Sequence, residues 1–149
     1  MPTKKRSRKN RVAVQYAVSP RGIPRAAALR AWTGSAHNIT LRIVGAREGR
    51  RLNFLYRKKN KATNVLSFPY GKGSGDVVLC HPVIAREARA QGKSVAAHYA
   101  HLVVHGILHL RGYDHEKKRD ARRMEAREVR VLRRFGFPDP YAVKSASPR

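Results

Sequence analysis

Apolar positions along the chain change their spacing several times, from the two-residue period of strands to the wider period of helices. Residues 12–18 are rich in β-branched side chains, and residues 39–44 alternate apolar with polar side chains, so both segments are predicted to be strands. Two more apolar runs, at residues 65–69 and 76–80, lie on either side of a glycine-rich segment. They predict a pair of strands joined by a flexible turn.

Helical spacing of apolar residues is found in five segments: residues 24–36, 47–56, 82–90, 94–111 and 117–135. The first is expected to have Pro24 in its opening turn, Ser94 can cap the fourth, and Gly112 can end it. The last has an apolar stripe that one acid, Glu128, interrupts. That stripe consists of Ala121, Met124, Val131, Leu132 and Phe135. Strands interleaved with helices and followed by a helical block favour an α+β layered fold, with a small mixed sheet of about four strands packed with about five helices.

The length of 149 residues fits one domain, which we expect over residues 12–142, between a disordered basic arm at 1–11 and a loose tail at 143–149. No apolar run approaches the roughly 20 residues of a membrane span, and residues 1–11 lack the apolar stretch of a secretory signal. Cys80 is the only cysteine, so an intrachain disulfide is excluded. A cytoplasmic location is the simplest expectation.

Charge favours a polyanionic partner. Lysine and arginine number 33 against 9 acids, a formal net charge of +24. An excess of this size is typical of proteins that bind nucleic acid or the ribosome, so RNA is the expected partner. The basic arm is open to two interpretations, a solubilising tail or an arm that contacts RNA.

The segment from Val95 to Leu110 is apolar on nearly every side and is predicted to be the central, buried helix. Its polar interruptions include four histidines, His98, His101, His105 and His109. At the helical period all four fall within an arc of roughly 80°. Burying a polar ring without a partner costs free energy, so these rings must be paired, bound to a metal, or facing a cleft.

Three histidines have the spacing of metal ligands. His105 and His109 lie one helical turn apart, Gly112 lets the chain reverse, and His115 arrives three residues later. The spacing matches that of the metzincin zinc proteases and predicts one bound ion, zinc first among the candidates. Those proteases carry a glutamate base directly after the first histidine, where this chain has Gly106. Gly106 either packs closely against a strand or leaves space for another group. In both cases the glutamate that accepts the proton in these peptidases is absent, which argues against a peptidase.

The histidine segment from residue 101 to 115, HLVVHGILHLRGYDH, resembles the signature of the YbeY endoribonuclease family. Similar blocks are YRKKNKATNVLSFP at residues 56–69, GDVV at 75–78 and FGFPDPY at 135–141, so the resemblance extends over about residues 12–142. Two positions depart from many relatives, which have aspartate in place of Asn60 and proline in place of Ala62.

The resemblance implies a single-strand-specific, zinc-dependent endoribonuclease that acts in ribosomal RNA maturation, at the 3′ end of the small-subunit RNA, and in ribosome quality control. It implies His105, His109 and His115 as the ligands of one zinc ion. It also implies Arg57 as the catalytic and substrate-binding arginine, since a guanidinium grips phosphate through two hydrogen bonds. The attacking group stays open between water and the RNA 2′-hydroxyl.

Other polar residues have two possible roles each. His101 either lines the cleft as a substrate-binding residue or forms a hydrogen bond inside the core. Asp76 is expected to be structural, and Asp114 to fix the turn before His115. Two alternative functions remain, a metalloprotease-like hydrolase and a non-catalytic ribosome-assembly factor with structural zinc. Three histidines without a fourth protein ligand argue against the second, because structural zinc sites are usually closed by four ligands.

Overall fold

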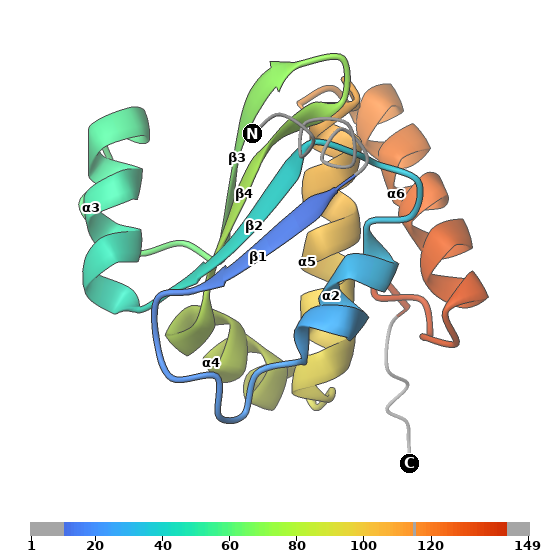
Figure 1. Cartoon of the computed structure of the whole chain (residues 1–149). Helices are drawn as coiled ribbons and strands as arrows, with labels where there is room; N and C mark the ends of the chain where they lie inside the picture. Colours follow the sequence, from blue (N-terminus) through green and yellow to red (C-terminus); the bar gives the residue numbers. More distant parts are fainter. Residues whose placement is uncertain (1–10, 115, 143–149) are drawn as a thin grey trace.

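The structure is a computed structural model that describes residues 11–114 and 116–142. Four strands form one sheet in the order β1-β2-β4-β3 (Figure 1). The strands are β1 (Val12–Tyr16), β2 (Ile39–Val44), β3 (Val65–Gly71) and β4 (Ser74–Cys80). β1, β2 and β4 are parallel, whereas β3 runs antiparallel to β4 at the edge of the sheet. The predicted strand pair is therefore confirmed, and the sheet is mixed.

Five helices pack on this sheet: α2 (Ala26–Trp32), α3 (Ala46–Arg57), α4 (His81–Gln91), α5 (Val95–Leu110) and α6 (Lys118–Arg134). α3 lies on one side of the sheet, while α2, α5 and α6 lie on the other (Figure 1). α5 contacts both the β3–β4 hairpin and α6, so it is the central helix of the larger layer. The predicted α+β fold is confirmed in the described part of the chain, with four strands and five helices.

The helix predicted over residues 24–36 is shorter than expected. α2 begins at Ala26 with Arg25 as its N-cap, so Pro24 lies before the helix and not in its first turn. The helix ends at Trp32, where the Thr33 hydroxyl donates to the carbonyl of Arg30 at 2.6 Å. Gly34 follows with a left-handed φ of 65°, which turns the chain out of the helix before Ala36.

Both predicted ends of the histidine helix are confirmed. The Ser94 side chain accepts a hydrogen bond from the backbone N–H of Ala97 at 3.0 Å and caps the N-terminus of α5. At the other end Gly112 has a φ of 97°, in which its N–H reaches the carbonyl of His109 and the N–H of Tyr113 reaches that of Leu108. These two bonds form a Schellman motif, which stops the helix and reverses the chain.

The main core lies between the sheet and the layer of α2, α5 and α6, and α5 contributes more of it than any other helix. A second, smaller cluster beneath α3 contains Val44, Val78 and Cys80. In α6 the buried positions are Met124, Glu128 and Leu132, so the acid lies in the middle of the buried stripe. Phe135, predicted to belong to that stripe, is 38% exposed. Phe137 takes the inner position, since α6 has already ended and the chain turns Phe137 onto Trp32.

No helix in the ranges 11–114 and 116–142 combines the length and the apolar character that crossing a lipid bilayer requires.

Candidate functional site

The histidines on α5 have specific polar partners, as burial of polar rings requires. His98 is 3% exposed, and its Nε2 lies 2.8 Å from a carboxylate oxygen of Glu87 on α4. Burial lowers the pKa of His98 below the usual value, against the opposing effect of Glu87. The same Glu87 oxygen accepts a hydrogen bond from Asn64 at 3.0 Å. His98 therefore ties α5 to α4 and to the strand that follows the Asn64 loop.

Glu128 is the partner of the next two histidines. Its carboxylate is 0% exposed and lies 2.5 Å from His105 Nδ1 and 3.2 Å from His101 Nε2. The Tyr141 hydroxyl donates to the same carboxylate. Burial by itself would raise the pKa of Glu128, but the hydrogen bonds from His101, His105 and Tyr141 outweigh it and hold this pKa at about 2. Glu128 is thus an ionised carboxylate enclosed by three donors.

This pairing orients His105. When Nδ1–H donates to the carboxylate, Nε2 is the ring nitrogen that carries the lone pair available to a metal. Histidines that bind metals usually donate the second ring nitrogen to a carboxylate, a carbonyl or water, and the contact of His105 with Glu128 has this form. The buried carboxylate therefore fixes both the tautomer and the direction of the ring.

A group that can hold a metal ion is present at the same place. The potential ligand atoms of His101, His105 and Glu128 all lie within 4.8 Å of one another. The predicted ligands overlap this group only at His105. His109 lies one turn further along α5, and its ring centroid is 5.0 Å from that of His105 at an interplanar angle of 80°. His115, the third predicted ligand, lies outside the described residues, so the predicted set remains a prediction.

A cavity of ≈ 610 Å³ brings together three of the predicted residues, Arg57, His105 and His109, whereas His101 is not part of its wall. His105 and His109 line one side of it, and Tyr56 and Arg57, from the last turn of α3, line another. The remaining wall comes from the loop and strand at residues 63–68, with Asp114 and Glu116 beyond the end of α5. Arg57 and the two histidines are separated by about fifty residues of sequence, yet all three face one cavity, as a metal-assisted phosphate reaction requires.

Asn53 anchors the loop that follows Arg57. Asn53 is 1% exposed; its side-chain N–H donates to the carbonyl of Lys61 at 2.8 Å, and its backbone carbonyl accepts from the N–H of Lys59 at 3.4 Å. Lys58 has a left-handed φ of 62°, which ends α3 directly after Arg57. Asn53 thus ties Lys59 and Lys61 back onto α3, and Arg57, the residue before this loop, lines the cavity.

Gly106 faces the sheet and not the cavity. A Cβ atom at this position would lie 2.8 Å from Val77 Cγ1 and 3.3 Å from Ser67 Oγ. The interpretation of close packing against a strand is therefore confirmed, and α5 approaches the β3–β4 hairpin here. The position that holds a glutamate base in zinc proteases has no room for one in this chain, which removes the main support for a metalloprotease.

Comparison with known proteins decides the family. Residues 8–136 match the family model described as Endoribonuclease YbeY. The chain belongs to the YbeY endoribonuclease family. Proteins of that name from Nitrosomonas eutropha and Thiobacillus denitrificans are 48% and 50% identical to it, each over 140 residues. The alignments cover 89% and 88% of this chain and 99% and 95% of those proteins.

The fold is also found in a solved structure. The solution structure of TM1509 from Thermotoga maritima has a TM-score of 0.53 and 21% sequence identity, and the match covers 89% of this chain and 100% of that one. At this identity the likeness shows the shared fold alone. The resemblance to the YbeY family inferred from the histidine block is thus confirmed by sequence relatives, and the fold by structure.

The other polar residues singled out in the sequence, His101, Asp114 and Asp76, each form hydrogen bonds in the structure. His101 contacts Glu128 and Tyr141, which matches the core alternative, and its substrate-binding role remains a prediction. The Asp114 side chain accepts a hydrogen bond from the backbone N–H of Glu116 at 3.2 Å, and its role in the turn before His115 remains a prediction. Asp76 accepts from the Tyr70 hydroxyl across the hairpin, in agreement with a structural role.

Sequence reasoning missed the partners of the site. Glu128 was noted only as an interruption of an apolar stripe, and Tyr141 only as part of a terminal motif. The sequence does hold a signal for Glu128: this acid lies four residues from Met124 and four from Leu132, both on the buried stripe of the helix. A carboxylate in such a position is buried and requires hydrogen-bond donors. Tyr56 and Phe68, which also line the cavity, carried no separate signal.

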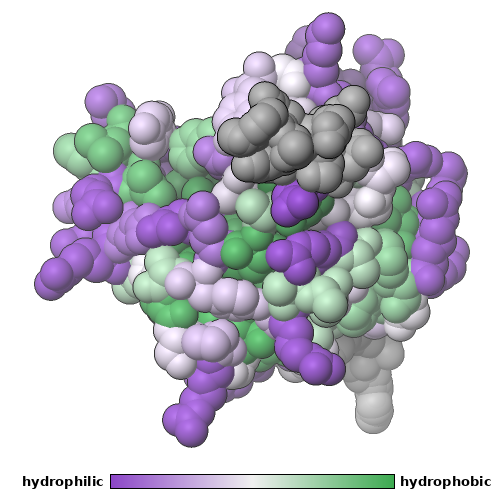
Figure 2. Space-filling view, in the orientation of Figure 1, coloured by the Kyte–Doolittle hydropathy of each residue, from purple (hydrophilic) through white to green (hydrophobic). Residues whose placement is uncertain are grey.

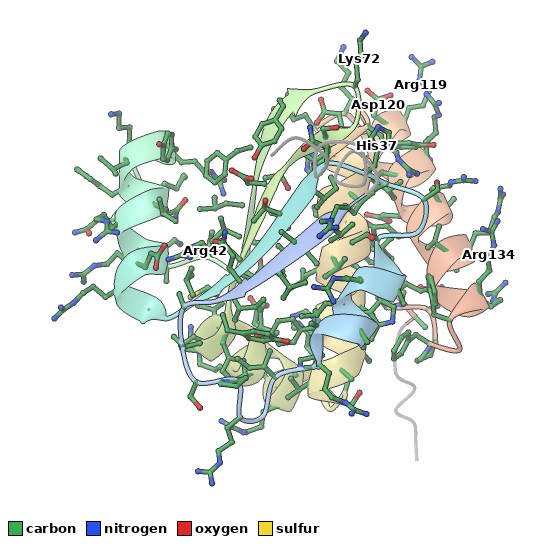
Figure 3. The ribbon with its side chains drawn as sticks, in the orientation of Figure 1. His37, Arg42, Lys72, Arg119, Asp120 and Arg134 are labelled. Carbon is green, nitrogen blue, oxygen red and sulfur yellow. The ribbon has the colours of Figure 1, made fainter. Side chains whose placement is uncertain are left out.

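The sequence of α6 is strongly basic. α6 with its N-cap, residues 117–134, carries nine basic residues against three acids. Arg119 and Arg134 point away from the protein at opposite ends of this helix, and Lys72 points outward at the tip of the β3–β4 hairpin (Figure 3). Hydrophilic side chains project outward around the molecule in this view, between patches of apolar surface (Figure 2). Such a distribution favours a polyanion as the ligand.

Proposed function

We propose that this protein is a zinc-dependent endoribonuclease that cuts single-stranded RNA, with ribosomal RNA as its substrate. The observation that carries the proposal is the cavity shared by Arg57, His105 and His109, whose residue types suit metal-assisted phosphodiester cleavage. Membership of the YbeY family supports the same reaction class. Action at the 3′ end of the small-subunit RNA and in ribosome quality control is the finer form of this proposal and rests on the family resemblance.

One zinc ion per chain is proposed to bind His105, His109 and His115. The chemistry of the donors fits: two imidazoles one turn apart face one cavity, and Glu128 holds the first in the tautomer that binds metal through Nε2. When bound, zinc supplies Lewis acidity and lowers the pKa of a bound water to about 7. Asp114 and Glu116, the neighbours of His115 in the sequence, both line the same cavity, which supports His115 as the third ligand.

Arg57 is proposed to hold the scissile phosphate. A guanidinium group can form two parallel hydrogen bonds to phosphate oxygens. The exposed end of α3 leaves it accessible, and Asn53 fixes the loop behind it. Arg57 therefore binds and orients substrate, whereas the histidines face the metal.

The buried group of His101, His105 and Glu128 favours a second candidate, an assembly factor whose metal is structural. An ion bound by Glu128 would be closed off from an incoming phosphate, because that carboxylate is 0% exposed. The contacts of 2.5 and 3.2 Å are those of hydrogen bonds between N–H donors and a carboxylate, which supports Glu128 as a partner of the histidines and not as a ligand. The first candidate is therefore preferred.

Cleavage assays on the full-length protein test the proposal. A labelled RNA is offered as a single strand and as a duplex, first with the protein as purified, then after chelation, and then after zinc is added back. Cleavage of the single strand alone, lost on chelation and regained with zinc, is expected. Protein with His109→Ala, purified in parallel, controls for contaminating nucleases. Cleavage that survives complete metal removal, or RNA left intact by zinc-loaded protein, would contradict the proposal.

A further inference from the structure

An aromatic pair forms one edge of the cavity. Tyr56, on the last turn of α3, and Phe68, on β3, pack edge to face with ring centroids 4.9 Å apart and an interplanar angle of 62°. Tyr56 is 64% exposed, and both residues line the same cavity as Arg57, His105 and His109. Phe68 thus supports a tyrosine ring that is open to solvent beside the proposed metal site.

The exposed end of α3 beside this pair is cationic, whereas the acids of the cavity wall, Asp114 and Glu116, lie beyond the end of α5. Arg57 follows Tyr56 directly, and Lys58 and Lys59 continue the exposed surface. The one acid of α3, Glu48, is paired with Arg42 through hydrogen bonds of 2.8 and 3.1 Å, so it does not offset these charges. Hydrophobic and hydrophilic surface alternate over α3 in Figure 2. Lysine is depleted at the centres of protein interfaces, whereas exposed aromatic rings beside lysine and arginine are typical of single-stranded nucleic-acid sites.

We propose that Tyr56, supported by Phe68, is a stacking platform for an unpaired RNA base and that it makes the site selective for single strands. This inference rests on the proposed function, since its ligand is RNA presented to the same metal site. A base in a duplex has both faces covered by its neighbours, so only an unpaired base can stack on a side chain. Arg57, the next residue, can hold the adjoining phosphate while Tyr56 holds the base.

The test is equilibrium binding of RNA to the full-length protein in chelator, which prevents cleavage. The single strand carries 2-aminopurine, whose fluorescence falls when it stacks, and a duplex of the same sequence is measured in parallel across a salt series. Tyr56→Leu is expected to weaken single-strand binding by about tenfold and to abolish the quenching. The slope of affinity against salt should stay unchanged, because no phosphate contact is lost, and duplex binding should also stay unchanged.

Two variants separate stacking from structural damage. Tyr56→Phe keeps the ring and should restore both affinity and quenching. Phe54→Leu removes another exposed aromatic ring, 50% exposed on the same helix, from a position that is not part of the cavity wall, and should behave like the wild type. Thermal melting of each variant reports on the fold.

Three results would overturn the platform: unchanged quenching in Tyr56→Leu, an equal loss of affinity for single strand and duplex, or an equal loss in Phe54→Leu. Its failure is distinguishable from that of the proposed function. If the wild type cuts single strands in a zinc-dependent way and Tyr56→Leu keeps the same preference, only the platform is wrong. If the wild type does not cut RNA, the proposed function is wrong as well.

Discussion

The two sides of the cavity differ in how their residues are held. On the α5 side, His105 is hydrogen-bonded to a carboxylate that is 0% exposed, and α5 itself lies between the sheet and α6. On the α3 side, Tyr56 is 64% exposed and Arg57 is the last residue of an outer helix. His105 is therefore fixed by the core, while the groups proposed for RNA lie on the surface. Changes on the first side should alter metal binding, and changes on the second should alter the binding and cleavage of RNA without altering metal binding.

The largest effect is expected on the α5 side and compares two variants. His109→Ala should lose stoichiometric zinc and all cleavage, because it removes a proposed ligand. Glu128→Gln should keep zinc but bind it about 10- to 100-fold more weakly, since it disturbs only the group that orients His105. Competition with a chromophoric chelator measures both affinities, and metal analysis of the purified proteins gives the stoichiometry.

The same pair of variants distinguishes the two candidate metal positions. If the ion binds the buried group of His101, His105 and Glu128, Glu128→Gln should abolish binding and His109→Ala should retain it. That reversed order would move the metal into the core and favour a structural role for it.

A second effect is expected on the α3 side. Arg57→Ala should lower the rate of RNA cleavage by about 10²- to 10³-fold, because a preorganised donor to the reacting phosphate is lost. Zinc content and melting temperature should not change, since the Arg57 side chain lies on the surface. Arg57→Lys should recover only part of the activity, because an ammonium group does not reproduce the planar fork of the guanidinium. Wild-type turnover in Arg57→Ala would remove this residue from the mechanism.

The smallest effect is on the free energy of unfolding and reports on how closely α5 packs against the sheet. In an open helix interior, Gly→Ala stabilises by about 1 kcal/mol. Here the added Cβ would lie 2.8 Å from Val77 Cγ1, so Gly106→Ala should instead destabilise the fold by about 1–3 kcal/mol. Chemical denaturation of the metal-free protein measures the change. A stabilised variant would mean that α5 is not seated closely on the hairpin.

Local features of the site were predictable from the sequence because helix geometry is periodic. The period alone placed four histidines on one arc of α5, and Ser94 and Gly112 marked its two ends. Errors occurred where local competition decides the outcome: the Thr33 hydroxyl and Gly34 end α2 early, and Phe137 replaces Phe135 on the core.

Long-range partners were not predictable from periodicity. Glu128 meets His105 across 23 residues of sequence, and Tyr141 reaches Glu128 from beyond the end of α6. Nothing in the spacing of α6 specifies which face of α5 it packs against. The identity of the histidine's partner therefore depends on tertiary packing, as does the meeting of Tyr56 with Phe68.

The position of β3 at the border of the sheet has a consequence for self-association. An uncovered strand border is a template onto which a strand of another molecule can add, which is a route to aggregation. β3 carries Pro69, which has no N–H to offer such a strand, and its pairing with β4 is irregular between Pro69 and Gly71. The border beside the cavity can thus remain open to a long polymer ligand without recruiting further copies of the protein.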